Sequence, residues 1–290
     1  MLRHTHVRLA RLIRDFNLST SQFQQLVEKF SSRMKFKDNE WVVNQSCADE
    51  ILHEIQKGVE LEYNKVSYTL PSWLKGNDKG WPGAINSLYA EPTVCPASVS
   101  PAQGELLRSL IYNIAPKNVV EIGCFLGVST LWMASALKDL GKDGVVHSID
   151  IFLPKFPYLS YHSSCLVDPL TRIETAIEYA GLKNHINLIQ QESKNALQEV
   201  NSALKGNGID LLFIDGDHSV EGCVQDFMNY SPLLSSGSYI ILHDIYPSVC
   251  GHEGPRYLID TILNKHDSEF ECVEIATSPS NYGMACIRKK

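Results

Sequence analysis

The sequence NVVEIGCFLGVST at residues 118–130 places a short apolar strand directly before a glycine turn and the start of a helix. Glycine at position 123 allows the backbone to approach a ligand closely. The spacing from Gly123 to Gly127 differs from the G-x-G-x-x-G of dinucleotide-binding folds, and the stretch lacks the Gly-Lys-Ser/Thr of a phosphate loop. The turn therefore predicts a ligand-binding α/β fold in which a pyrophosphate is not the favoured ligand.

Working outward from this turn, short apolar runs alternate with helical patterns, which is typical of a doubly wound parallel sheet. We expect strands at 118–122, 145–150, 186–190, 209–214 and 238–242, and a closing pair at 270–275 and 283–287. Helices are expected at 103–114, 129–140, 170–180, 195–204 and 220–230. The pattern predicts an α/β, Rossmann-like, doubly wound and mostly parallel seven-stranded sheet.

The N-terminal part of the chain has a different pattern. Helices are expected from Thr20 or Ser21 to Phe30 and over 48–62, and a loop rich in turn formers and aromatics follows at 68–96. We therefore divide the chain into a helical N-terminal extension and lid, residues 1–92, and a ligand-binding domain, residues 93–290.

Composition excludes several classes of protein. The 290 residues carry 26 Lys+Arg against 33 Asp+Glu, a net charge of −7, which argues against nucleic acid as a partner. The apolar runs are too short for a membrane span, which needs about 18 residues. The eight cysteines are scattered without a C-x-x-C pair, and we interpret the arginine-rich start as a basic helix rather than a targeting segment. We expect a cytoplasmic protein without a membrane anchor.

Asp150 stands at the end of the second expected strand, 27 residues beyond Gly123. A carboxylate there can accept hydrogen bonds from both hydroxyls of a ribose. A ribose site without a pyrophosphate site favours S-adenosylmethionine as the cofactor. The glycine turn and Asp150 each have a structural alternative, because such turns are common and an aspartate at a strand end can simply cap a helix.

Over about residues 100–290 the sequence resembles the class I S-adenosylmethionine-dependent methyltransferases. The resemblance is carried by VEIG at 120–123 and, more specifically, by FIDGDHSVEG at 213–222 followed by GSYIILHDI at 237–245. The IDGDH and HD segments are similar to those of small-molecule O-methyltransferases related to the catechol and caffeoyl-CoA enzymes. This resemblance makes residues 93–290 the S-adenosylmethionine-binding methyltransferase domain.

The resemblance implies a set of cofactor-binding residues. The methionine half would be lined by Glu121, Gly123, Phe125 and Ser129, the ribose held by Asp150, and the adenine contacted by Glu192 and Ser193. Asp215 and His218 complete the implied cofactor site. For each of these the structural alternative is a cap or turn role.

Methyl transfer to a hydroxyl needs a group that removes its proton, and His218 is our leading general base because relatives place a catalytic lysine there. The alternative is that His218 only hydrogen-bonds the cofactor or caps the following helix. Metal-dependent relatives also imply an ion on Asp215, His243 and Asp244. An imidazole suits Mn, Fe or Zn better than Mg, so the metal stays open, and without it His243 becomes a second base or a substrate partner.

Two aromatic segments, 151–162 and 246–256, together with Trp73 and Trp81, are expected to close an apolar acceptor pocket. The alternative is ordinary packing. We predict methyl transfer to a hydroxyl of a small molecule, plausible in specialised metabolism. Alternatives are metal-free N-methylation of a small amine, a non-catalytic cofactor-binding scaffold and a nicotinamide oxidoreductase. By analogy with related enzymes, the N-terminal helices would mediate a homodimer.

Overall fold

The computed structural model divides the chain into two compact units, residues 1–65 and 66–290. It describes residues 6–8, 29–37, 40–44, 47–48, 50–51, 68–91, 94, 97–141, 143–153, 155–156, 166–263, 265, 268–276 and 282–290. We predicted a boundary between residues 92 and 93, where the N-terminal extension would end and the ligand-binding domain begin. This boundary stays a prediction.

In the first unit, the described residues form a small antiparallel sheet in the order β1-β3-β2. Its strands are β1 (His6–Arg8), β2 (Lys35–Lys37) and β3 (Glu40–Asn44), and the 3-10 helix η1 (Ser31–Arg33) precedes β2. Sequence analysis did not foresee this sheet, and His6–Arg8 is a strand where we expected a basic helix. The helices predicted up to Phe30 and over 48–62 lie mostly outside the described residues, although 29–30, 47–48 and 50–51 are helical.

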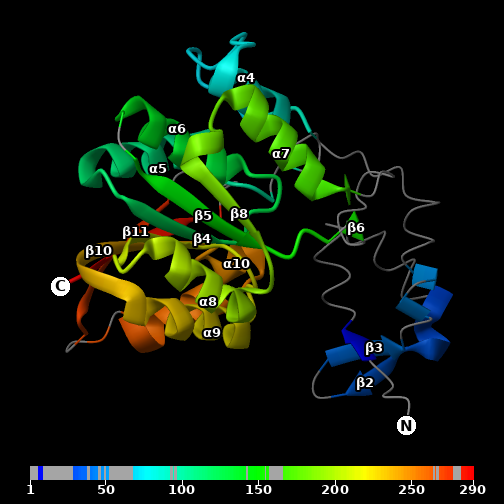
Figure 1. Ribbon diagram of the computed structural model, residues 1–290. Helices are drawn as coiled ribbons and strands as arrows, with labels where there is room; N and C mark the ends of the chain where they lie inside the picture. Colours follow the sequence, from blue (N-terminus) through cyan, green and yellow to red (C-terminus); the bar gives the residue numbers. More distant parts are fainter. Residues whose placement is uncertain are drawn as a thin grey trace. The chain divides into compact units, whose positions relative to one another are not determined.

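The second unit is built on a seven-stranded sheet in the order β11-β12-β10-β9-β4-β5-β8 (Figure 1). Neighbouring strands from β10 to β8 are parallel, whereas β12 runs antiparallel to both β10 and β11. The bounds are β4 (Asn118–Ile122), β5 (Val145–Asp150), β8 (Ile186–Gln190), β9 (Ile209–Ile214), β10 (Leu234–His243), β11 (Phe270–Ile275) and β12 (Met284–Lys289). The predicted α/β, mostly parallel seven-stranded sheet is confirmed.

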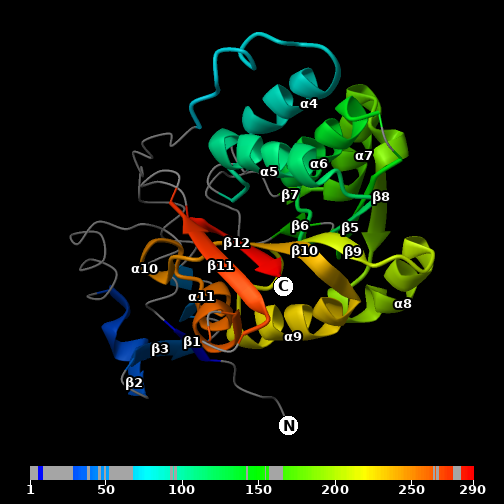
Figure 2. The ribbon, with the colours of Figure 1, turned by 90° about the vertical axis from the view of Figure 1, so that its left-hand side faces the viewer.

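Helices cover both faces of this sheet (Figures 1 and 2). One face packs against α4 (Gly80–Tyr89), α5 (Pro101–Ile114), α6 (Val128–Asp139) and α7 (Pro169–Ala180). The opposite face packs against α8 (Ser193–Leu204), α9 (Val220–Tyr230) and α11 (Gly254–Leu258). All five residues of β4 are buried, because a central parallel strand has helices on both sides; three are apolar, and Asn118 and Glu121 are buried with hydrogen-bond partners.

Shorter elements connect the sheet and its helices. They are a two-stranded ladder of β6 (Lys155–Phe156) and β7 (Leu166–Val167), the 3-10 helices η2 (Lys183–His185) and η3 (Ser231–Leu233), the single turn α10 (Pro247–Cys250) and the π-helix η4 (Ile259–Leu263). Among the described residues, none of the helices has the length and apolarity that crossing a membrane requires.

The strand order places the ligand-binding end of the sheet. After β4 the chain moves outward through β5 and β8, then returns to form β9 beside β4 and continues to β10. In open parallel sheets this reversal point leaves a crevice at the carboxyl ends of the strands. The residues that follow β4, β5, β9 and β10 therefore converge at one edge.

Candidate functional site

The glycine turn after β4 lies directly against the end of β9. Gly123 has φ +91°, and a Cβ at this position would lie 2.1 Å from the carbonyl oxygen of Asp215. The Gly123 amide donates to Ile149 O (3.0 Å), while the Asp215 amide donates to Ile122 O (2.8 Å). Only glycine fits here, both because φ is positive and because the neighbouring backbone is so close.

Asp150 fixes this turn to the end of β5. Its Oδ2 accepts hydrogen bonds from the amides of Cys124 (2.9 Å) and Phe125 (2.8 Å), and its Oδ1 accepts one from Phe152 N (2.8 Å). Phe125 itself adopts φ 52°. A carboxylate oxygen has two lone-pair sites, so Asp150 retains acceptor capacity for a ligand while it shapes the loop.

Glu121 is fully buried beneath the turn. Its Oε1 accepts from the Ser129 hydroxyl, and its Oε2 accepts from Thr130 and Ser148. Burial raises the pKa of Glu121 to about 7, against the lowering effect of the three hydroxyls. Glu121 and Ser129, which we expected to line the methionine half, are thus hydrogen-bonded to each other. With a pKa of about 7, the Glu121 carboxyl changes charge near neutral pH.

The two residues expected to contact the adenine, Glu192 and Ser193, have different surroundings. Ser193 begins α8, and its hydroxyl donates to the buried Asp226 on α9. Burial raises the pKa of Asp226 to about 6. Glu192 is exposed and pairs with Lys194 at 2.7 Å. Ser193 therefore belongs to an internal network, while the Glu192 carboxylate extends into solvent.

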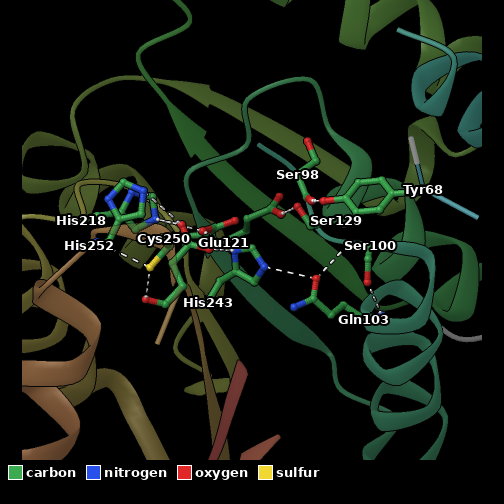
Figure 3. A network of polar contacts seen from close by, with 12 residues as sticks. Tyr68, Ser98, Ser100, Gln103, Glu121, Ser129, His218, His243, Cys250 and His252 are labelled. Carbon is green, nitrogen blue, oxygen red and sulfur yellow. Dashed lines mark hydrogen bonds and ion pairs between the residues drawn. The ribbon is translucent and has the colours of Figure 1, made fainter. Parts of the chain in front are cut away.

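The ends of β9 and β10 bring together two aspartates and two histidines. His218 Nε2 lies 3.2 Å from Asp215 Oδ1 and 3.3 Å from Asp244 Oδ2. His243 Nδ1 lies 3.0 Å from Asp215 Oδ1 and 2.9 Å from Asp244 Oδ1. Figure 3 shows His243 between the pair His218 and His252 on one side and Gln103 on the other.

The charges in this cluster act on each other. Burial alone would lower the pKa of His243, but the carboxylates of Asp215 and Asp244 raise it well above the usual range. The pKa of His218 is likewise raised, because Asp215 and Asp244 outweigh the effect of burial. In return, the two imidazoles hold the pKa of Asp215 well below its ordinary value although its burial opposes this. The cluster therefore keeps the Asp215 carboxylate ionised and attracts protons or another cation.

Two observations fit a cation on Asp215, His243 and Asp244, whose ligand atoms all lie within 4.8 Å of one another. His243 Nδ1 donates to Asp215, and within the described part of the chain the buried Asp244 Oδ1 accepts no hydrogen bond although it lies 2.9 Å from the same nitrogen. His243 Nε2 lies 3.3 Å from Gln103 Oε1, an acceptor that would hold the proton on Nε2 when a cation replaces the proton on Nδ1.

Sequence analysis missed Gln103, although the pattern that could have revealed it was present. Gln103 is the third residue of α5 and forms a capping box with Ser100, whose amide donates to Gln103 Oε1 at 2.8 Å. The S-x-x-Q pattern signals such a box. His252 was also missed as a site residue, because its approach to Asp244 (3.6 Å) depends on how the loop after β10 folds back.

The aromatic residues expected to form a lid pack against one another. Trp73 and Trp81 both make ring contacts with Trp132 of α6, at 5.9 and 5.8 Å between centroids. The Arg108 guanidinium lies 4.3 Å from the Trp81 ring centroid. Most of segment 151–162 lies outside the described residues, so its lid role stays a prediction.

The chain is similar to known methyltransferases. Residues 120–245 match the family described as a methyltransferase domain. The chain is similar to a catechol O-methyltransferase of Niastella koreensis (29% identity over 156 residues, 53% of this chain and 62% of the relative). It is also similar to a rhamnosyl O-methyltransferase of Mycobacterium tuberculosis (23% over 239 residues, covering 78% and 84%).

A solved structure extends the similarity to the fold. The O-methyltransferase from Bacillus cereus in complex with SAH superposes with a TM-score of 0.54 at 20% identity, covering 71% of this chain and 89% of that one. The matches span between 55% and 62% of the length of the first curated relatives. The resemblance expected from the IDGDH and HD segments is therefore confirmed for the domain and its fold.

Proposed function

We propose that this chain, whose residues 120–245 match a methyltransferase domain, transfers a methyl group from S-adenosylmethionine to a hydroxyl of a small molecule. The observation that carries the proposal is the position of His218 between Asp215 and Asp244, at the same sheet edge as the Gly123 turn and Asp150. Relatives named as O-methyltransferases support transfer to oxygen.

Several residues of the chain would hold the cofactor, which supplies an activated methyl group on a sulfonium cation. Gly123 lets the turn after β4 pack directly against the end of β9, and Asp150 offers its remaining acceptor site, on Oδ1, to a ribose hydroxyl. Phe125, Ser129, Glu192 and Ser193 are the further candidates. The ionised Asp215 places negative charge near the turn, which favours a positive ligand.

His218 acts as the general base in this proposal. Because Nε2 directs its proton to Asp215 and Asp244, its Nδ1 would accept the proton of the acceptor hydroxyl, and the two carboxylates stabilise the imidazolium that forms. The same carboxylates raise the pKa of His218, so its neutral and active form grows as the pH rises above the ordinary histidine value. His243 is too deeply buried to share this role and serves to hold Asp215 and Asp244.

Asp215, His243 and Asp244 would hold a divalent cation such as Mg²⁺ or Mn²⁺. Two features support this assignment: Asp244 Oδ1 accepts no hydrogen bond among the described residues, and His243 Nδ1 faces both carboxylates, where an ion would replace its proton. Bound there, the ion would lower the pKa of a chelated hydroxyl and fix its orientation.

The relatives named above suggest the chemical class of the methyl acceptor. Catechols and rhamnosyl groups both carry adjacent hydroxyls, and such a pair can chelate an ion while one oxygen accepts the methyl group. We therefore propose a small molecule with neighbouring hydroxyls as the acceptor.

The test is methyl transfer by the full chain. Purified protein, S-adenosylmethionine and Mg²⁺ are incubated with catechol, a rhamnoside and matched amines, and products are identified by mass spectrometry. Methylated catechol or rhamnoside is the expected product. Methylation of the amines alone would establish N-methylation instead, and cofactor binding without transfer to any acceptor would favour a scaffold role.

The remaining proposals concern partners and location. We propose that the N-terminal segment mediates a homodimer, which light scattering of the full chain against a chain lacking residues 1–65 would test. Nucleic acid is not proposed as a substrate, given the net charge of −7. A cytoplasmic location is proposed from the free thiols of Cys124, Cys223, Cys250, Cys272 and Cys286.

A further inference from the structure

A second group of possible metal ligands lies beside the first. His218, Asp244 and His252 offer ligand atoms that all lie within 4.8 Å of one another. The two Nε2 atoms approach the same oxygen, Asp244 Oδ2, at 3.3 Å from His218 and 3.6 Å from His252. Asp244 thus directs one oxygen to His243 and the other to this second group, and Figure 3 shows both imidazoles on the side away from Gln103.

Backbone contacts fix His252 in this position. The Gly254 amide donates to His218 O at 3.0 Å, and a Cβ at Gly254 would lie 2.7 Å from that oxygen. The loop after β10 is therefore seated directly on the His218 backbone. As a result, the two imidazole rings stack with centroids 4.2 Å apart and an interplanar angle of 31°.

The separations suit a tetrahedral ion. Zinc binds histidine nitrogen and carboxylate oxygen at about 2.0–2.2 Å, so neighbouring ligand atoms of a tetrahedral site lie about 3.3–3.6 Å apart. The separations of Asp244 Oδ2 from the two Nε2 atoms, 3.3 and 3.6 Å, lie within this range. The His252 side chain is 39% exposed, which leaves one side of the group open to water or a fourth ligand.

We propose that His218, Asp244 and His252 form a transition-metal site that binds Zn²⁺ and is distinct from the Asp215–His243–Asp244 site. Two imidazoles and one carboxylate favour Zn²⁺ over Mg²⁺, which prefers oxygen ligands and water. Asp244 is the only residue that the two sites share.

The second site has a consequence that rests on the proposed function. A Zn²⁺ ion on His218 Nε2 leaves the proton of the neutral imidazole on Nδ1, so His218 has no lone pair left to accept the proton of the acceptor hydroxyl. Zinc at this site is therefore inhibitory, whereas an oxygen-preferring ion such as Mg²⁺ leaves His218 available.

The first experiment measures binding and does not depend on activity. The full chain, freed of metal, competes for Zn²⁺ with a chromophoric chelator, and Co²⁺ serves as a spectroscopic probe of imidazole ligation. Variants are His252→Asn and His252→Gln, with His185→Asn as the control and Asp215→Asn to remove the first site alone. Loss of a ligand should weaken Zn²⁺ binding at least as much as loss of an outer-shell partner does, about 10–100-fold.

The outcomes separate the two sites. Weakened binding in both His252 variants, with wild-type affinity in His185→Asn and retained affinity in Asp215→Asn, supports the proposal. Zn²⁺ affinity that is unchanged in the folded His252 variants, or that is lost in Asp215→Asn instead, overturns it.

The second experiment follows methyl transfer with increasing Zn²⁺ at fixed Mg²⁺, each variant being normalised to its own rate without zinc. Inhibition that shifts to at least about tenfold higher Zn²⁺ in the His252 variants supports the inhibitory role. Activation by Zn²⁺, or inhibition that is unchanged in those variants, overturns that role. If the chain transfers no methyl group at all, the proposed function fails while the binding experiment still decides the zinc site.

Discussion

Glu121→Gln tests whether the buried carboxyl beneath the glycine turn is held protonated by its surroundings. Glu121 is fully buried, and burial raises its pKa from 4.5 to about 7. A difference of one in pKa between the folded and unfolded states corresponds to about 1.4 kcal/mol, so this rise corresponds to about 3 kcal/mol.

The direction in which the free energy of unfolding changes with pH follows from which state, folded or unfolded, holds the Glu121 proton. Below about pH 4.5 the carboxyl is protonated in both states, and the folded protein has its full stability from this group. As the pH rises toward 7, the unfolded chain releases the proton while the folded chain keeps it, so the free energy of unfolding falls. Above about pH 7 both states are ionised, and the loss levels off at about 3 kcal/mol.

Glutamine has the same shape and no charge, and the hydroxyls of Ser129, Thr130 and Ser148 can turn to accept from its amide. The assay is urea denaturation of wild type and variant at pH values from about 4 to 8.5. The difference in unfolding free energy between them should change by about 3 kcal/mol in favour of the variant as the pH rises. Glu174→Gln, on the exposed side of α7, is the control. If the difference in unfolding free energy between wild type and variant does not change across this pH range, the reasoning is refuted.

Three further predictions concern the same sheet edge. His218→Gln should lower the methyl-transfer rate by about 100- to 10,000-fold near neutral pH, with S-adenosylmethionine binding largely retained, as measured by S-adenosylhomocysteine release and calorimetry. In the wild type the rate should rise with pH through a pKa above the ordinary histidine value, and a flat profile would contradict a histidine base. Gly123→Ala should cost more than about 3 kcal/mol in unfolding free energy or prevent folding, because its Cβ would meet Asp215 O at 2.1 Å, and a normal melting temperature would contradict this. Asp150→Asn should weaken cofactor binding and cost about 1–3 kcal/mol of stability, because an amide cannot accept from the Cys124, Phe125 and Phe152 amides together; equal binding by calorimetry would argue against it.

The central strands of the sheet could be predicted closely because each contains a short apolar run, and those of β4 and β9 are buried on both faces. The expected bounds of the strands at 118–122, 145–150, 186–190 and 209–214 agree with β4, β5, β8 and β9. The start of β10 was placed four residues late, at Ser238. Polar residues and Gly237 (φ +85°) interrupt the apolar pattern there, and the pairing with β9 shifts its register between Leu234 and Tyr239.

The candidate site was predictable where local sequence determines position. Gly123, Asp150, Asp215 and the pair after β10 follow strand ends, and the strand order alone brings strand ends together. His252 could not be found in this way, since its place depends on a loop returning to the His218 backbone through Gly254. Such a contact joins residues far apart in the chain, and no periodic pattern encodes it.

The geometry of the site finally depends on how β10 ends. Successive residues of a strand point to opposite faces, so His243 and Asp244 would diverge if the strand continued. Asp244 instead adopts φ 61°, and its amide donates to Gly283 O at 3.1 Å. This left-handed turn brings Asp244 Oδ1 within 2.9 Å of His243 Nδ1. Aspartate and asparagine tolerate this conformation better than most residues, so the position requires both a short polar side chain for the backbone and a carboxylate for the cluster. Asp244→Asn separates the two requirements, because it keeps the turn while removing the charge that both proposed metal sites share.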